Sequence, residues 1–171
     1  MKNPQNVLQL EWGVILITTM QQLRLARMHM IGRVKRVEEA KWDFQPEGFN
    51  NTIRWHAGHI FVTMETLIQQ GVNSYEPRYP EWIPLFVDGT SPQQWKDDIP
   101  THVEILSALR EQPEWATDFL KDKLADKMFE PLIIGDNIMT IDDIDGIIQF
   151  IAWHEGVHAG VIDSLSKLSM S

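Results

Sequence analysis

The residues of this sequence best suited to chemistry are two histidines four positions apart, in the run His154-Glu155-Gly156-Val157-His158. In a helix, four residues advance the chain by about 400° and about 6 Å, so both imidazoles lie on one face. Two imidazoles placed in this way can bind the same divalent metal. The surrounding segment has a helical pattern, because apolar residues recur at steps of three and four from Ile144 to Leu168. Thr140, followed three residues later by the acidic Asp143, is a suitable start signal for that helix.

A metal held by protein usually needs at least three side chains, and a catalytic site keeps a further position open for water or substrate. His59 lies in an apolar segment that we expect to form a helix packed against the last one, where it would complete a three-histidine site. His56, three residues earlier, is the rival candidate. We favour His59 because its neighbours Gly58 and Ile60 have the character of packed core.

The run from His154 to His158 also matches the H-E-x-x-H signature of zinc peptidases, in which the glutamate deprotonates a zinc-bound water. Its context differs from those enzymes. The position six residues after His158 is Ser164, no glutamate follows Glu155, and no strand-rich region is evident. These features disfavour a peptidase. Two roles of Glu155 stay open: a base or hydrogen-bond partner at the site, and a solvated residue of the helix surface, which is favoured.

Length and composition narrow the function classes. The 171 residues contain no long polar linker, which predicts a single domain over residues 1–171. The net charge of −9 argues against a nucleic-acid partner, and basic residues of the first helix, Arg27 among them, are interpreted as a solvated face. The absence of cysteine excludes disulfides, thiolate metal sites and a cysteine nucleophile. The first ten residues lack an apolar signal core and no apolar stretch is long enough to span a membrane, so a soluble cytoplasmic protein is expected.

Two long helices are predicted in the first half of the chain. No proline interrupts the segment from about Val7 to Ala40, and Gly32 is the place where this first helix could break. Its apolar residues occupy more than one face, which fits either a homodimer interface or one wide stripe facing the core. The second helix is expected to begin at Asn51 or Thr52, run to about Gln70 and end at Gly71.

Between Val72 and Pro100, prolines and aromatic residues replace the helical pattern, which indicates a long functional or covering loop. A short helix over Ser91–Asp97 could form within it. Two interpretations stay open for three aromatic residues of this loop, a place in the core or the lining of a pocket: Trp82, Phe86 and Trp95.

The third helix is predicted over Thr101–Gln112, with a capping box formed by Thr101 and Glu104, and we expect Trp115–Asp126 to continue it beyond Pro113. The segment Phe129–Asn137 reads as a connector, with a turn at Gly135-Asp136-Asn137. No segment shows the alternation expected of a sheet. The predicted fold is therefore an all-α bundle with a long irregular loop between helices 2 and 3.

Two segments together resemble the DinB-like (DinB/YfiT) superfamily: Asn51-Thr52-Ile53-Arg54-Trp55-His56-Ala57-Gly58-His59-Ile60 and Phe150-Ile151-Ala152-Trp153-His154-Glu155-Gly156-Val157-His158-Ala159-Gly160. The middle segment from Phe86 to Pro92, with Trp95, also looks like its members, so the resemblance covers most of the chain. It implies a four-helix bundle that holds a divalent metal, zinc or nickel, through one histidine on the second helix and the histidine pair on the fourth. These ligands correspond here to His59, His154 and His158. It also implies a homodimer, which is frequent in the family.

The resemblance implies less about the reaction. Some members are S-transferases or isomerases that use the metal to hold a low-molecular-weight thiol as thiolate, and others are described only as metal-dependent hydrolases. We therefore expect a metal-dependent enzyme, with transfer of a small thiol to an electrophile ahead of hydrolysis. A non-catalytic metal-binding dimer is the alternative from another class. An enzyme would keep a coordination position open, whereas the non-catalytic protein would have a closed site or no metal.

Overall fold

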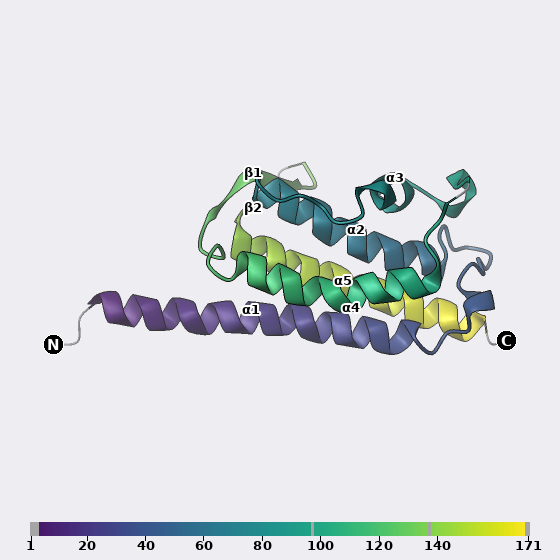
Figure 1. The fold of residues 1–171 in the computed structure, drawn as a ribbon, viewed down its shortest axis with the longest axis horizontal. Helices are drawn as coiled ribbons and strands as arrows, with labels where there is room; N and C mark the ends of the chain where they lie inside the picture. Colours follow the sequence, from purple (N-terminus) through teal and green to yellow (C-terminus); the bar gives the residue numbers. More distant parts are fainter. Residues whose placement is uncertain (1–3, 97, 137, 170–171) are drawn as a thin grey trace.

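The computed structural model describes residues 4–96, 98–136 and 138–169, and within these ranges it describes side chains from residue 19 onward. Four long helices run along the long axis of the molecule (Figure 1): α1 (Pro4–Val34), α2 (Ile53–Gly71), α4 (His102–Leu120) and α5 (Ile144–Leu168). Helix α5 packs on both α1 and α2, and α4 packs on the same two helices. The mainly helical character predicted from the sequence is confirmed.

The prediction of an all-α fold is wrong in one place. A two-stranded antiparallel sheet, β1 (Lys127–Ile134) and β2 (Met139–Asp143), occupies the segment expected to be an irregular connector. Both strands are largely exposed, and their pairing is irregular between Lys127 and Leu132. The sequence of these strands therefore lacks the regular alternation of apolar and polar residues that marks a strand with one buried face. The turn is confirmed at Gly135 and Asp136, whose φ angles are +51° and +42°, while Asn137 lies outside the described residues.

The limits of α1 and α2 follow from local signals. Helix α1 ends at Val34, six residues before the predicted Ala40, and continues through Gly32 without a break. Helix α2 agrees with its prediction. The hydroxyl of Thr52 accepts a hydrogen bond from the backbone nitrogen of Trp55 at 3.3 Å, and the helix ends at Gly71.

The later helices are capped by carboxylates and hydroxyls. The capping box of Thr101 and Glu104 is confirmed at the start of α4, and this helix passes through Pro113 to end at Leu120, short of the predicted Asp126. Helix α5 has the predicted limits, but its capping residue is Asp143. That carboxylate accepts a hydrogen bond from the backbone nitrogen of Gly146 at 2.7 Å, so Thr140 is not the cap.

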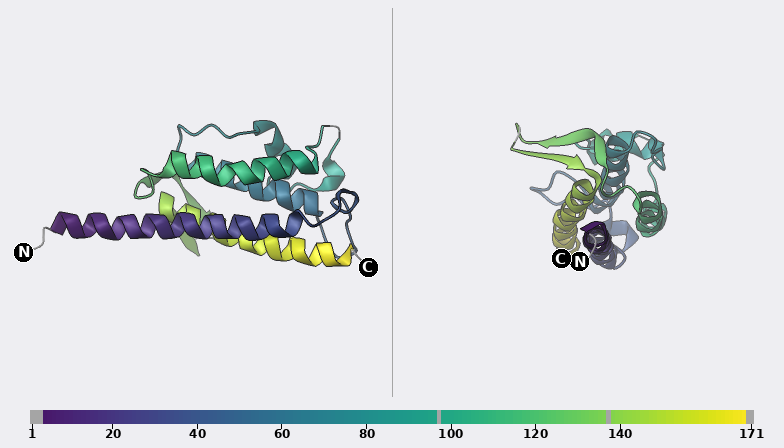
Figure 2. Two further views of the ribbon diagram at one scale, coloured as in Figure 1. Left: turned by 60° about the horizontal axis from the view of Figure 1, so that its bottom comes forward. Right: turned by 90° about the vertical axis from the view of Figure 1, so that its left-hand side faces the viewer.

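The long loop after α2 covers that helix on the side away from α1 (Figure 2). It contains two short 3₁₀ helices, η2 (Pro80–Trp82) and η3 (Pro92–Gln94), and the single-turn helix α3 (Ile83–Phe86). The short helix predicted over Ser91–Asp97 is represented only by η3 in the described part of that segment, and Asp97 lies outside the described residues. Trp82 and Phe86 are buried, so for these two residues the interpretation as core is confirmed. Trp95 is partly buried and packs against the same hydrophobic core.

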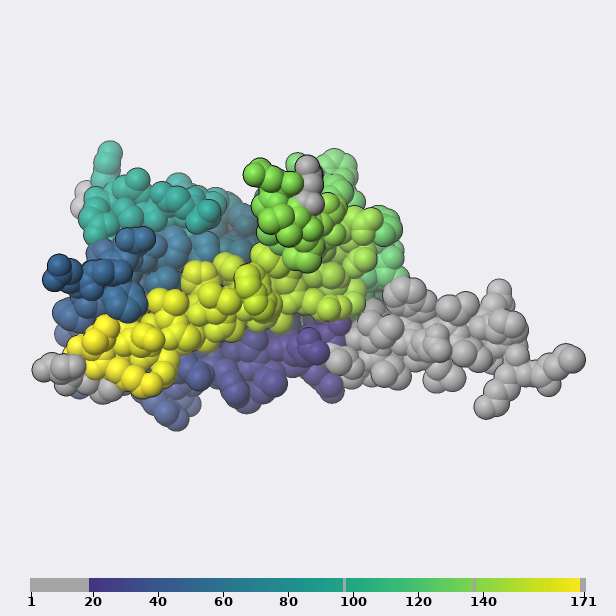
Figure 3. Space-filling model, turned by 180° about the vertical axis from the view of Figure 1, so that it is seen from behind, coloured from purple at the N-terminus to yellow at the C-terminus, as the bar shows by residue number. Residues whose placement is uncertain are grey.

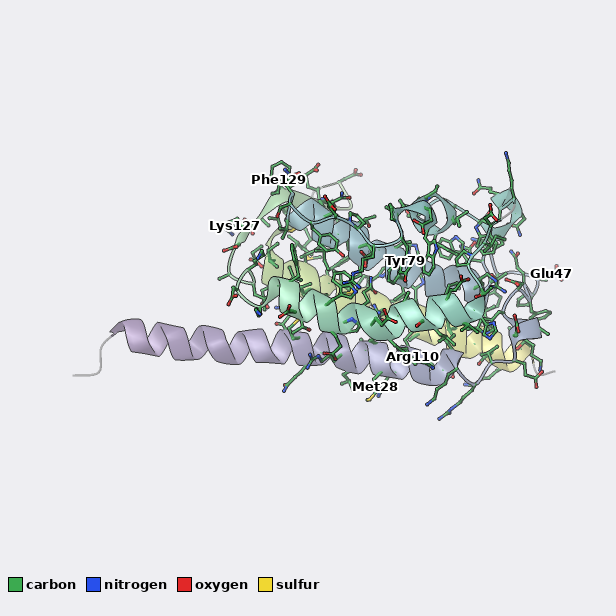
Figure 4. The ribbon with its side chains drawn as sticks, viewed as in Figure 1. Met28, Glu47, Tyr79, Arg110, Lys127 and Phe129 are labelled. Atoms are coloured by element: carbon green, nitrogen blue, oxygen red, sulfur yellow. The ribbon has the colours of Figure 1, made fainter. Side chains whose placement is uncertain are left out.

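The surface shows which elements stay accessible. Seen from behind, α5 lies across the face of the molecule beside the β1–β2 hairpin (Figure 3). Lys127 and Phe129 project from the hairpin, and Met28 projects from the outer side of α1 (Figure 4). In the described part of the chain, no helix combines the length and the apolarity required to cross a bilayer.

Candidate metal centre

The three predicted metal ligands meet where α2 packs against α5. His59 comes from α2, and His154 and His158 come from successive turns of α5. The Nε2 atom of His154 lies 3.2 Å from Nε2 of His59 and 3.1 Å from Nε2 of His158. One nitrogen from each of the three rings falls within 4.8 Å of the others, so the group could hold a metal ion. We call these three residues the histidine cluster.

A backbone carbonyl fixes the orientation of His59. Its Nδ1 lies 2.8 Å from the carbonyl oxygen of Phe86, which can only accept a hydrogen bond. Nδ1 therefore carries the hydrogen, and Nε2 keeps its lone pair directed at the other two histidines. A carbonyl or carboxylate in this position is the usual outer partner of a metal-binding imidazole.

Tight packing holds that carbonyl in place. A Cβ atom built on Gly58 would come within 2.5 Å of the Phe86 ring, so only glycine lets α3 approach α2 this closely. On the other side, the Trp55 ring stacks on His59 with centroids 4.4 Å apart, and its indole nitrogen donates to the Thr90 hydroxyl at 2.9 Å. The loop after α2 and the first turns of α2 together hold the His59 ring.

His56 does not join the cluster but contacts it. Its Nδ1 lies 2.8 Å from Nδ1 of His158, on the edge of that ring opposite the Nε2 that faces His154. The His56 side chain is buried, with 8% of its surface exposed. Among the histidines considered from sequence, the structure thus groups His59 with the α5 pair and places His56 behind His158.

Burial keeps all of these imidazoles neutral. Burial first, and then repulsion from neighbouring histidines, lower the pKa of His154 to about 4 and that of His158 to about 2. Burial is also the main cause that lowers the pKa of His59 and of His56, the latter to about 4. Asp88 acts weakly in the opposite direction on His59 and His154. Three neutral nitrogen donors converge with no positive group between them, a donor set that suits a divalent metal such as zinc.

Glu155 is directed into the protein core. With 1% of its surface exposed it forms an ion pair with Arg27 of α1, so the favoured interpretation as a solvated residue is wrong. Arg27 also donates to the carbonyl oxygen of Leu109 at 2.8 Å and contacts the sulfur of Met64. The interpretation of Arg27 as part of a solvated face is therefore wrong too. A role of Glu155 as base stays a prediction, and the ion pair is a competing use of the same carboxylate.

Two aromatic residues near the cluster were missed by the sequence analysis. Trp55 stacks on His59, and the Phe150 ring lies 6.2 Å from that of His154 in a stacked orientation. Each precedes its histidine by four residues on the same helix, so the spacing that revealed the histidine pair could also have revealed them. Trp153 packs beside Phe150 with ring centroids 5.4 Å apart and remains 62% exposed.

Comparison with known proteins places this arrangement in a family. The family model of the DinB superfamily matches residues 22–162, which include the whole of α2, α4 and both α5 histidines. A search among curated proteins gives no match. The match spans most of the sequence, and the chain belongs to the DinB superfamily.

Proposed function

We propose that this protein is a metal-dependent enzyme that binds a divalent cation, zinc or nickel, through His59, His154 and His158, and that it transfers a small thiol to an electrophile. The observation that carries the proposal is the histidine cluster itself. Its three neutral imidazoles face one another on two adjacent helices, and the family match includes all three residues. His154 and His158 are partly exposed on α5, which favours access of a small substrate to the cluster from that side.

The protein's own residues hold and orient the donors. The Phe86 carbonyl keeps the hydrogen of His59 on Nδ1, and Trp55 shields the face of that ring from water. Phe150 and Trp153 place apolar surface next to His154, against which the carbon skeleton of a substrate can pack. When bound, a divalent cation supplies Lewis acidity, which lowers the pKa of a water or a thiol that joins it.

Thiol transfer is preferred over hydrolysis because of Glu155. In an H-E-x-x-H hydrolase the glutamate takes the proton from water, and here that carboxylate is engaged by Arg27 inside the core. A thiol is more acidic than water and gives up its proton more easily, so it depends less on a protein base. Hydrolysis and a purely structural metal site are the alternatives that the experiment below separates.

The proposal includes the arrangement and assembly expected for the family. We interpret the four long helices as its four-helix bundle, with the β1–β2 hairpin as an addition between α4 and α5. A homodimer through α1 is supported by Leu25 and Met28, which lie on that helix with 51% and 61% of their surfaces exposed. Size-exclusion chromatography with light scattering would measure the mass, and an unchanged mass in Leu25→Gln/Met28→Gln would contradict this interface.

Metal analysis of purified protein tests the function. We expect one zinc or nickel ion per chain in the wild type and loss of that ion in His59→Ala, His154→Ala and His158→Ala. The matched control is His29→Ala, since His29 is exposed on α1 and away from the cluster. After cobalt substitution, a small thiol should shift the visible spectrum of the wild type. A wild type that stays metal-free in excess zinc would overturn the proposal. A bound metal without a thiol response, but with ester or amide cleavage, would favour hydrolysis, and neither response would favour a structural metal.

A further inference from the structure

A second histidine pair lies behind the cluster. The two Nδ1 atoms of His56 and His158 are 2.8 Å apart, close enough for a strong hydrogen bond. His56 belongs to the first turn of α2, where its backbone nitrogen bonds the Thr52 carbonyl oxygen, and the Trp55 ring packs edge-on against its imidazole. The His56 ring is therefore held in place both by the backbone of α2 and by the neighbouring Trp55 ring.

Only one hydrogen can lie between these two nitrogens. In a neutral imidazole one ring nitrogen is a donor and the other an acceptor, so one ring must donate and the other accept. The Nε2 of His158 faces Nε2 of His154 at 3.1 Å, inside the cluster. If that Nε2 is to offer its lone pair to a cation, the hydrogen of His158 must sit on Nδ1. His56 must then accept through Nδ1 and carry its own hydrogen on Nε2.

The same arrangement exists at the other end of the cluster. His59 donates from Nδ1 to the Phe86 carbonyl, which frees its Nε2. His56 thus has the same position relative to His158 that the Phe86 carbonyl has relative to His59. The difference is chemical, because a carbonyl can only accept, whereas an imidazole accepts at Nδ1 only in one of its two neutral tautomers.

We propose that His56 is a positioning residue for the metal centre: its Nδ1 accepts the hydrogen of His158 Nδ1 and so holds the Nε2 of His158 as a lone-pair donor. This inference rests on the proposed metal site and adds a residue outside the set of three ligands. His56 is not a fourth ligand in this arrangement, because its Nδ1 contacts the Nδ1 of His158, which is the nitrogen of that ring that does not face the cluster.

Two substitutions separate an acceptor from a ligand. In His56→Asn, the side-chain oxygen occupies nearly the place of the imidazole Nδ1 and still accepts from His158. In His56→Leu, a side chain of similar bulk offers no acceptor. Loss of such an outer partner usually weakens metal binding by about 10- to 100-fold. Zinc affinity, measured by competition with a chromophoric chelator, should therefore fall by this factor in His56→Leu and stay near the wild-type value in His56→Asn.

A second readout follows the hydrogen directly. Long-range nitrogen–proton NMR of the wild type should find His158 protonated at Nδ1 and His56 protonated at Nε2. Helix content by circular dichroism checks that both variants fold. Equal zinc affinity in wild type and His56→Leu, or a hydrogen on Nδ1 of His56, would overturn the inference while leaving the metal site intact. Equal loss in both variants would instead identify His56 as a ligand. A wild type that binds no zinc would remove the proposed function itself.

Discussion

Two neighbouring residues of α5 lead into two different polar environments. His154 joins a cluster of neutral imidazoles, while Glu155, the next residue, pairs with Arg27 in the core between α1 and α5. In the first environment like groups converge without an opposite charge. In the second a cation and an anion neutralise each other, and a further guanidinium hydrogen is taken by the Leu109 carbonyl. The comparison favours the histidine cluster as the ligand-binding site, because its imidazoles form no ion pair with a carboxylate in the part of the chain that the structure describes.

A third buried polar group resembles the ion pair. The carboxylate of Glu65 accepts hydrogen bonds from the Tyr75 hydroxyl at 2.6 Å, the Arg78 backbone nitrogen at 2.7 Å and the Gln112 amide at 2.6 Å. These contacts join the start of the long loop to α2 and α4. Burial nevertheless raises the pKa of Glu65, as it does that of Glu155. Both glutamates join neighbouring elements of the core, whereas the nitrogens of the histidine cluster converge on one another and can offer their lone pairs to a cation.

The strongest test of this comparison substitutes the two adjacent α5 residues in metal-free protein. Glu155→Gln leaves the Arg27 guanidinium buried without a carboxylate, and since arginine does not give up its proton, we expect a loss of about 3–5 kcal/mol in the free energy of unfolding. His154→Gln removes a neutral ring and should cost about 1 kcal/mol or less. Urea unfolding measures both.

The control for that experiment removes both charges. Arg27→Met/Glu155→Leu replaces the pair by apolar side chains and should recover most of the stability that Glu155→Gln loses. If Glu155→Gln and His154→Gln cost the same, the ion pair does not have the structural role assigned to it. Zinc affinity should stay unchanged in the double variant, because its side chains contact the core and not the cluster.

Adding zinc should bring the stability losses of the two substitutions closer together, because only the histidine cluster is expected to bind the ion. A ligand that binds only the folded state at a hundred times its dissociation constant adds about 2.7 kcal/mol to the free energy of unfolding. We expect this gain in the wild type and in Arg27→Met/Glu155→Leu, and none in His154→Gln. A gain of the same size in His154→Gln would place the zinc elsewhere on the protein.

Gly58→Ala tests how tightly the loop must approach α2. The new Cβ would lie within 2.5 Å of the Phe86 ring, so the ring and its carbonyl must move away. Such overpacking typically costs about 1–3 kcal/mol. Because the same carbonyl orients His59, zinc binding should weaken as well. The matched control is Gly156→Ala on α5, where nothing lies within 4 Å of the added Cβ. A loss of stability without any loss of zinc affinity would separate the packing from the site.

The sequence predicted some of these features and could not have predicted others. The limits of α5 and the three clustered histidines were accessible because they depend on spacing within single helices and on one contact between two helices. The hairpin was not, because residues such as Phe129 and Ile133 are 68% and 58% exposed and leave no regular buried face. The burial of Arg27 depends on a carboxylate 128 residues away, and periodicity within α1 carries no information about that partner.

The smallest expected effect is a change in the pH dependence of stability, measured with a chelator present. His154 has a pKa lowered to about 4, below its ordinary value of 6.5, so between these values the unfolded chain binds a proton that the folded protein does not. Stability contributed by the neutral ring is therefore full above pH 6.5 and is lost as the pH falls towards 4. Glu65 and Glu155 have raised pKa values and act in the opposite direction, so the informative quantity is the difference between wild type and His154→Gln. The variant should lose part of the slope, at most about 1.4 kcal/mol per pH unit for one group. Parallel curves for the two proteins would mean that burial does not lower the pKa of this imidazole, and the histidine cluster would then lose its neutral donor at His154 below about pH 6.5, as an exposed histidine does.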